Sequence, residues 1–512
     1  MRKIFKPMKR YYLLGAVSIM AAHLATSTLK GEETNTVEII RQLQQRIENL
    51  EQKINQLERA KPAAPEPEGK ERVLELEQKV KVLERNRELD VEAGEAKAKE
   101  APKLTLGSDG FGLSSADGAF AVQLKGVLQV DSRSFFEDHG IKGNDSILLR
   151  RARPILQGTL FRDFDFLFVP DFGGTGNPQI FDAYLNYRYS PALQLQAGKF
   201  KSPIGLEQLQ ADVDILFNER ALPTALVPNR DLGFELHGDL FGGVASYAAG
   251  IFNGVGDARN SSNFDFEDNK AFEGRVFFQP FKKSSAPALQ NLGFGVAGSY
   301  EIMQGTNVTG LPGTTGGTLA GFTTDGQQQF FAYNPSSNAV VVADGEHWRL
   351  SPQGYYYYGP FGLMGEYVIS DQRVSRTVTA PFRSARLDNR AWQVTASWVL
   401  TGEDAVYKGR VVPRSPFNPS QGDWGAFQLV GRYAELDVDD AAFPLFANPN
   451  TSASSAKAWS VGLNWYLNRN VVFKTSFSHT IFSGGGGSGS SAPAAVTRTD
   501  ENVLFTRIQL SF

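Results

Sequence analysis

The chain ends with the stretch LFTRIQLSF (residues 504–512), which decides the fold class. In an extended strand, Leu504, Ile508, Leu510 and Phe512 share one face, and an arginine, a glutamine and a serine occupy the other. A soluble domain usually frays into polar residues at its end. A terminal strand that is apolar on one face and closes on a phenylalanine predicts instead the last strand of a membrane barrel, where only every second residue faces lipid.

The same period of two runs through the chain from about residue 104 onward. It is clear in FAVQLKGVLQVD (120–131) and DFDFLFVPDF (163–172). The segments WQVTASWVL (392–400) and WSVGLNWYL (459–467) each carry two tryptophans, spaced so that they can reach the two interfaces of a bilayer. The pattern is therefore typical of strands that cross a membrane.

We count about sixteen such segments, an even number, as a single-chain bacterial barrel requires. The prediction is an all-β membrane protein, an antiparallel transmembrane β-barrel. The predicted strands are 120–132, 147–160, 163–172, 179–190, 193–201, 231–240, 243–253, 271–281, 292–303, 346–357, 361–370, 389–400, 424–436, 457–467, 471–482 and 501–512.

Short and long connections alternate along this predicted barrel, as periplasmic turns and extracellular loops do. The turns at 162–163, 190–192 and 468–469 are short, and long connections rich in Gly, Asn, Ser and Asp lie between them. The connection 401–423 is long where a short turn is expected. Either the strand count is off there, or this segment is ordered in the periplasm.

Composition excludes several other classes of protein. The 512-residue chain has a net charge of −3 and a pI of about 6.1, unlike a dedicated nucleic-acid binder. Cysteine is absent, which excludes disulfides and thiolate sites. The five histidines are scattered, and no nucleophile elbow, metal-ligand pair or phosphate-cradling glycine loop accompanies them. The sequence therefore predicts no enzyme, no metal site and no cofactor.

Residues 1–27 have the pattern of a secretory signal peptide. The basic stretch MRKIFKPMKR (1–10) precedes the apolar stretch YYLLGAVSIMAA (11–22), which is too short to span a bilayer as a helix. Cleavage after Ala25 or Ser27 fits this pattern, and a retained anchor is the alternative.

Residues 28–60 carry a coiled-coil pattern. The Pro-rich linker 61–70 ends it. Residues 71–103 hold a second, shorter coiled coil and a linker. The pattern of this second coiled coil fails at Arg87, and its seam positions are Val73, Leu76, Val80 and Leu83. Isoleucine at heptad position a with leucine at position d favours a coiled coil of two helices. The alternative is a single solvated helix held by charge pairs. The seam positions of the first coiled coil are Ile40, Leu43, Ile47, Leu50, Ile54 and Leu57.

Alternating strands also occur in large soluble sandwiches and propellers. Those folds would not combine a signal peptide, apolar faces opposite polar ones, alternating loop lengths and a terminal aromatic strand. A mean hydropathy of −0.27 argues against a helical membrane protein of this size. We therefore predict that 104–512 is one transmembrane β-barrel.

Seven blocks of this barrel follow one another in a distinctive order: DGFGLSSADGAFAVQLKGVLQVD, LLRRARPILQGTL, FDAYLNYRY, LQLQAGKFKSPIGLEQL, PNRDLGFELHG, WQVTASWVLTGED and GAFQLVGRYAELDVD. These blocks, in this order, resemble the phosphate-selective porin O and P family of Gram-negative outer membranes. The resemblance covers essentially all of 104–512 and implies a sixteen-stranded trimeric channel in the cell outer membrane. It also implies a third extracellular loop folded into the lumen and basic residues that guide anions to a narrow point. A trimer disagrees with the two-strand preference of the coiled coil, and we expect the trimer.

Charges that line a pore decide which ions it selects. Inward-facing basic and acidic residues are about equal in number, so selectivity must rest on local clusters. Arg150, Arg151 and Arg153 form one cluster, and the connection 202–230, the predicted third extracellular loop, holds another. Acidic residues in that loop could equally pair with these arginines and only hold its shape. The pore-lining and anion-binding candidates are Lys125, Arg151, Arg153, Arg188, Lys201, Arg220, Arg230, Arg275 and Arg349.

The sequence thus predicts passive diffusion of small anions, with phosphate as the expected partner, through a lumen narrowed by the third loop. The alternative is a general or cation-preferring diffusion porin whose coiled coil is a periplasmic tether to the cell wall. A helical segment of about 24 residues would reach about 36 Å, far enough to project into the periplasm. The other expected partners are outer-membrane lipid and further copies of the chain, and no nucleic acid.

Overall fold

The computed structural model describes residues 67–136, 143–174, 176–263, 268–304, 319–334, 341–376, 383–487 and 496–512, with single positions between 45 and 56. The predicted signal peptide and most of the predicted coiled coil and linker up to residue 66 lie outside the described residues. The chain divides into two compact units, Met1–Ala96 and Lys97–Phe512.

One long helix, α2 (Pro67–Glu100), begins inside the predicted linker 61–70 and runs through most of 71–103. Proline fits the first turn of a helix, because the N–H that it lacks would have no partner there. All four seam positions predicted for this segment are exposed: Val73, Leu76, Val80 and Leu83. The coiled coil therefore stays a prediction. Within the described residues, no helix is both long and apolar enough to cross a membrane.

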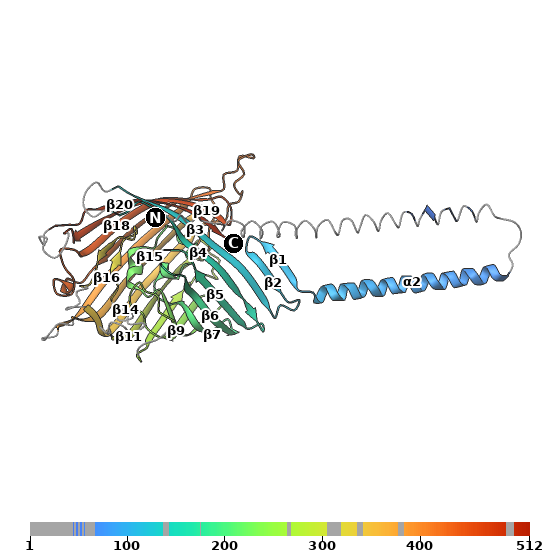
Figure 1. Cartoon of the computed structure of the whole chain (residues 1–512), viewed down its shortest axis with the longest axis horizontal. Coiled ribbons are helices and arrows are strands. Elements are labelled where there is room, and N and C mark those ends of the chain that lie inside the picture. The colour runs from blue at the N-terminus through green and yellow to red at the C-terminus, as the bar shows by residue number, and fades with distance from the viewer. Residues whose placement is uncertain are drawn as a thin grey trace, which may run out of the picture. The chain divides into compact units, whose positions relative to one another are not determined.

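The second unit is a closed barrel of antiparallel strands (Figure 1). Closure comes from the last strand, β20 (Glu501–Ser511), which pairs with the first strand of the ring, β3 (Ala121–Phe135). The all-β class and the predicted count of sixteen are confirmed, since two of the eighteen strands of the sheet lie outside the ring. The strands between β3 and β20 are β4 (Ser146–Leu160), β5 (Phe164–Asp171), β6 (Gln179–Ser190), β7 (Leu193–Lys201), β8 (Arg230–Leu240), β9 (Ala245–Phe252), β10 (Ala271–Phe278), β11 (Leu292–Gln304), β14 (Val341–Tyr358), β15 (Phe361–Arg376), β16 (Arg383–Val399), β17 (Ala426–Asp437), β18 (Ala453–Tyr466) and β19 (Val471–Gly484).

The two strands outside the ring form a hairpin that the sequence analysis did not predict. They are β1 (Lys103–Gly107) and β2 (Gly110–Ser114), and β2 pairs with β3 from Leu124 to Ala121. Each strand is only five residues long, and glycine is frequent in both, which weakens the strand signal.

Side chains alternate along the strands between the lumen and the outer face. In β17, Arg432 is buried on the inner face and Leu429 is exposed on the outer face. Aromatic pairs lie on the outer face near the short turns, where Trp398 stacks on Phe361 with ring centroids 5.7 Å apart. This is the arrangement expected for a barrel whose outer face contacts lipid and whose aromatic residues lie at an interface.

Loop lengths orient the barrel, because short turns mark the periplasmic end and long loops the extracellular end. The turns 161–163, 191–192 and 467–470 are short, as predicted. The long connection 400–425 between β16 and β17 also lies at the periplasmic end. The sequence left two explanations for this segment, a wrong strand count or an ordered periplasmic segment. The second explanation is right, because the strand count holds and the segment is ordered.

Three extracellular loops pack on one another and on the wall. They are L3 (202–229), the fifth loop (305–340, described from 319 to 334) and the seventh loop (438–452). Their apolar side chains join one buried cluster, which contains Leu222 of L3 and Phe331 of the fifth loop. The short elements of the connections are α3 (Leu206–Leu209), η1 (Leu222–Leu226), η2 (Pro287–Leu289), β12 (Phe322–Thr323), β13 (Gln329–Phe331) and η4 (Asp440–Ala442).

Candidate functional site

L3 lies inside the barrel, where inward-facing side chains of the wall hold its backbone. Gln129 on β3 donates to the Asp212 carbonyl oxygen at 3.2 Å, and Gln509 on β20 donates to the Val213 carbonyl oxygen at 3.0 Å. Two further donors, from β18 and β19, hold the following residues of L3 in the same way. L3 is therefore attached along a continuous part of the wall.

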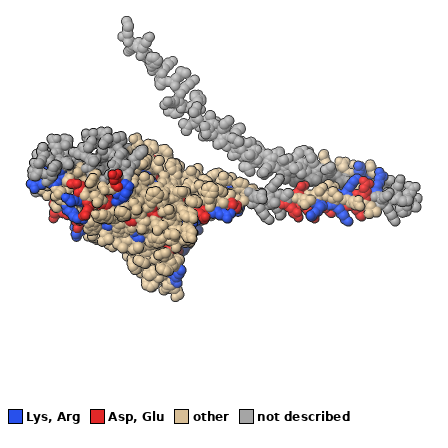
Figure 2. All heavy atoms as spheres, turned by 90° about the horizontal axis from the view of Figure 1, so that it is seen from below, with Lys and Arg blue, Asp and Glu red and all other residues tan. Residues whose placement is uncertain are grey.

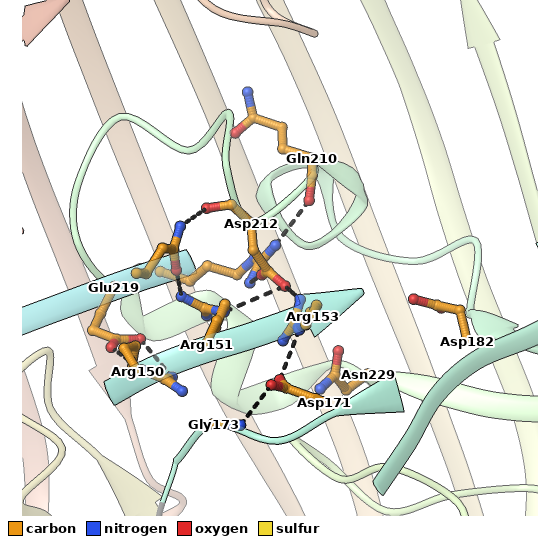
Figure 3. A network of polar contacts seen from close by, with 12 residues as sticks. Arg150, Arg151, Arg153, Asp171, Gly173, Asp182, Gln210, Asp212, Glu219 and Asn229 are labelled. Carbon is orange, nitrogen blue, oxygen red and sulfur yellow. Dashed lines mark hydrogen bonds and ion pairs between the residues drawn. The ribbon is translucent and has the colours of Figure 1, made fainter. Parts of the chain in front are cut away.

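Three arginines share one carboxylate of L3, Asp212 (Figure 3). Arg153 Nη1 and Arg220 Nη1 form ion pairs with its two oxygens, and Arg151 Nε lies 3.5 Å from Oδ2. Asp212 itself is buried. Because the one negative charge of Asp212 is shared by three positive charges, this part of the lumen keeps a local excess of positive charge.

A second carboxylate of L3, Glu219, binds the neighbouring arginines of the wall. Arg150 Nε donates to Oε1 at 2.6 Å, and Arg133 Nη2 donates to the same oxygen at 3.0 Å. Charge-assisted hydrogen bonds of this kind are stronger than neutral ones. They fix L3 at Glu219 to β3 and β4.

The arginines keep both L3 carboxylates ionised. Burial alone would raise the pKa of the Asp212 carboxyl, but the charges of Arg151, Arg220 and Arg153 outweigh it and hold this pKa well below its usual range. Burial would also raise the pKa of the Glu219 carboxyl, but the charge of Arg150 outweighs burial, so the pKa of Glu219 also lies below its usual range.

An aromatic ring and two more carboxylates complete the network. Asp171 accepts from Arg153 Nε at 2.6 Å, and Asp182 accepts from Arg230 Nε at 3.3 Å. The ring centroid of Phe181 lies 3.9 Å from Cζ of Arg153 and 3.7 Å from Cζ of Arg230. The ring attracts both cations without neutralising either.

These side chains line a cavity of about 450 Å³, the arginine cavity, between β4, L3 and the fifth loop. Its lining has five arginines and three carboxylates, a formal excess of two positive charges. Thr224, Asn229 and Thr323 add hydroxyl and amide groups. In the part of the chain that the structure describes, no group of three or more His, Asp or Glu side chains is arranged to hold a metal ion. The cavity can thus offer donors to a small oxyanion.

A second cavity, of about 560 Å³, lies nearer the periplasmic end, and we call it the periplasmic cavity. One of its walls is aromatic and includes Tyr355 on β14 and Tyr407 of the connection 400–425. Its charged lining residues are Lys201, Arg275, Lys282, Lys408, Glu235 and Asp239. The lumen therefore offers two chambers that differ in chemistry.

The structure brings some of the predicted site residues together and separates others. Lys125 lies near the periplasmic end of β3, away from both cavities. The predicted residues of the arginine cavity are Arg151, Arg153, Arg220 and Arg230, and those of the periplasmic cavity are Lys201 and Arg275.

Two further predicted residues are engaged in local ion pairs. Arg349 is buried, and it pairs with Asp257 at 2.7 Å and with Glu301 at 3.0 Å, which fixes the fourth loop to β11 and β14. Arg188 lies near the periplasmic end of β6 and pairs with Asp165 at 2.9 Å.

Lys199 and Tyr407 are not among the predicted site residues, although Lys199 leads into the predicted third loop. Strict alternation puts Lys199 on the lipid-facing side, but it is 7% exposed, and Nζ donates to the Ser261 carbonyl oxygen at 2.7 Å. The pairing of β7 with β6 and β8 keeps its register here, and the preceding residue, Gly198, has φ 132°, which residues with a side chain rarely adopt. The only signal for Tyr407 is the unexpected length of its segment.

Comparison with known proteins agrees with this architecture. The family described as phosphate-selective porin O and P matches residues 122–512. Porin O of Pseudomonas aeruginosa is 24% identical over 389 residues, which cover 72% of this chain and 84% of that protein.

Two solved outer-membrane proteins are similar in structure. The channel DcaP of Acinetobacter baumannii has a TM-score of 0.47 and 10% identity, over 77% of this chain and 98% of its own. An anion-selective porin from Comamonas acidovorans has a TM-score of 0.46 and 11% identity, over 77% of this chain and 100% of its own. On the family match, which covers most of its length, the chain belongs to the phosphate-selective porin O and P family, as an outer-membrane channel for small anions and not an enzyme.

Proposed function

We propose that small anions of the phosphate type diffuse passively through this channel, and that L3 narrows the lumen at the arginine cavity. One observation carries the proposal: five arginines line this cavity against three carboxylates, and three of the arginines share Asp212. A low-dielectric wall around such an excess focuses the field on a passing anion.

The donors of the arginine cavity are not all used. Arg151 Nε is buried and makes no hydrogen bond, although it lies 3.5 Å from Asp212 Oδ2. A buried donor without a partner carries a desolvation cost, which a bound anion would remove. Guanidinium groups suit phosphate because they donate two parallel hydrogen bonds to its oxygens.

The experiment is a zero-current potential in planar bilayers, first in a potassium chloride gradient and then with added phosphate. We expect anion preference and a block of chloride current by phosphate. R151Q and R153Q should each weaken that block about tenfold, because each removes a charged hydrogen-bond donor. R386Q is the matched control, since Arg386 is exposed on β16 and lines neither cavity.

A second candidate is a general or cation-preferring porin that the helices tether to the cell wall. The observation in its favour is that each of the five arginines of the arginine cavity already has a carboxylate partner. A weak or cationic preference in the same measurement, with no effect of R151Q, would favour this candidate over the first.

We also propose that the protein is a homotrimer whose α2 helices meet along the exposed seam. Burial of Leu76 and Leu83 would remove apolar surface that the single chain leaves in water. The variant L76K/L83K should lower the thermal stability of the native oligomer and leave the conductance of each barrel unchanged. L74K is the control, because Leu74 is equally exposed but lies off the seam. Equal effects of both variants would count against the trimeric seam.

A further inference from the structure

The periplasmic connection 400–425 enters the barrel and meets L3. Tyr407 is 9% exposed, and Val411 of the same segment is buried. Both belong to an apolar cluster with Leu206 of L3 and with Val399 and Val472 of the wall. A segment with buried apolar side chains in the lumen is part of the packed structure of the channel, and it approaches L3 from the side opposite to the arginine cavity.

Tyr407 forms two hydrogen bonds with L3. Its hydroxyl donates to the Leu206 carbonyl oxygen at 2.7 Å, and its own carbonyl oxygen accepts from Gln210 Nε2 at 2.5 Å. A third bond follows two residues later, where the Gly409 N–H donates to Asp214 Oδ2 at 3.0 Å. The periplasmic connection therefore holds L3 between Leu206 and Asp214. The arginines of the wall hold L3 at Asp212 and Glu219.

The ring of Tyr407 is itself fixed to the wall by stacking. It stacks on Tyr355 of β14 with centroids 4.4 Å apart and planes at 21°, and Tyr355 stacks on Phe277 of β10 at 5.1 Å. Cζ of Arg275 lies 4.4 Å from the centre of the Phe277 ring. Stacked rings of this kind restrict the side chain to one position. A residue that is rigid on one side and hydrogen-bonded to a loop on the other can set the place of that loop.

We infer that Tyr407 is a positioning residue, which sets the location of L3 from the periplasmic side and so the width of the path past L3. The inference rests on the proposed role of L3 in narrowing the lumen. It assigns a function to the long periplasmic connection, which the sequence analysis left without one. It does not require Tyr407 to touch the permeating anion.

The first test is the variant Y407F, which keeps the stacked ring and removes only the hydroxyl that binds Leu206. Y247F is the matched control, because Tyr247 also lines the periplasmic cavity. Its hydroxyl donates at 2.8 Å to the Ala192 carbonyl oxygen, which lies in a short turn and not in L3. Single-channel recordings should show larger conductance and more frequent current transitions for Y407F. Y247F should match the wild type.

The second test measures the position of L3 directly. The chain has no cysteine, so A211C in L3 carries the only thiol, and Ala211 is exposed. Loss of one neutral hydrogen bond should shift the equilibrium between the held and the released position of L3 about fivefold. In Y407F, a charged thiosulfonate should therefore modify A211C about fivefold faster. Y247F should leave the rate unchanged.

Unchanged conductance and unchanged A211C rates in Y407F would overturn the inference, and so would equal changes in Y247F. The failure of the proposed function is a different result: if the wild type shows no anion preference while Y407F still alters conductance and labelling, the positioning role stands and the anion-binding role falls.

Discussion

Arg507 in the last strand and Asp131 in the first strand of the ring form a bidentate ion pair, with Nε–Oδ1 and Nη2–Oδ2 distances of 2.6 and 2.7 Å. Both side chains are fully buried in the lumen. The pair lies where β20 meets β3, so it bridges the seam at which the barrel closes.

Removal of one partner of this pair should be strongly destabilising. D131N or R507Q would break a buried ion pair by removing one partner, which typically costs about 3–5 kcal/mol. Urea unfolding in detergent, followed by the shift between folded and unfolded bands on gels, measures it. The exposed pair of Arg162 and Asp117 near the β4–β5 turn is the control, and D117N should have little effect. Equal midpoints for D131N and D117N would contradict the prediction.

The charges of Asp212 and Glu219 should not change between pH 7 and about pH 5. The folded-state pKa values of Asp212 and Glu219 lie below their unfolded values, so their ion pairs contribute stability above the usual carboxylate pKa of about 4. That contribution is lost only when the pH falls through the lowered folded-state values. Zero-current potentials of the wild type and of D212N at several pH values test this. The difference in anion preference between the two proteins should stay constant from pH 7 to pH 5, and a difference that shrinks between pH 6 and pH 5 would argue against these ion pairs.

The variant D212N should strengthen anion binding. The amide removes the negative charge that Arg151, Arg153 and Arg220 share, so the positive excess of the arginine cavity rises by one. The phosphate concentration that halves the chloride current should fall several-fold. A change of this size corresponds to the loss of one repulsive charge interaction in a partly shielded site. D440N, at an exposed position of the seventh loop, changes the net charge equally and should leave the block unchanged. A weaker block in D212N would mean that Asp212 acts mainly by holding L3.

Gly158 on β4 should not tolerate alanine. An added Cβ would lie 2.0 Å from the Ala121 carbonyl oxygen of β3, so the backbone of two paired strands would have to separate. G158A should therefore lower the yield of folded barrel. A Cβ added at Gly431 on β17 would meet no atom within 4 Å, so G431A should fold like the wild type. Equal yields of both variants would show that the pairing of β3 with β4 adapts.

The sequence was sufficient to predict the barrel, because the period of two is imposed on every strand by lipid on one side and water on the other. Strand ends were less accurate: β14 begins at Val341 rather than at 346, and β16 at Arg383 rather than at 389. These extensions lie at the extracellular ends, where the outer face no longer contacts lipid and the pattern weakens.

The candidate site was only partly predictable. Arg151 and Arg153 stand out as neighbours on one strand face, but their link to Arg220 depends on the path of L3, which no local pattern encodes. Tyr407 could not be predicted, because its partners Leu206 and Tyr355 are distant in sequence and a turn that folds inward has no signature of its own. Tertiary contacts, not periodicity, place both residues.

The hairpin β1–β2 has a consequence for the order of folding. Arg507 and Asp131 are 376 positions apart, so β3 leaves the ribosome long before the strand that will close on it. In the meantime its open edge is a template for pairing with other chains. β2 precedes β3 directly in the chain and occupies residues 121–124 of the same edge, next to the part that β20 later takes. The hairpin can thus shield one end of the unfinished seam during transit through the periplasm and leave free only the stretch that the last strand must fill.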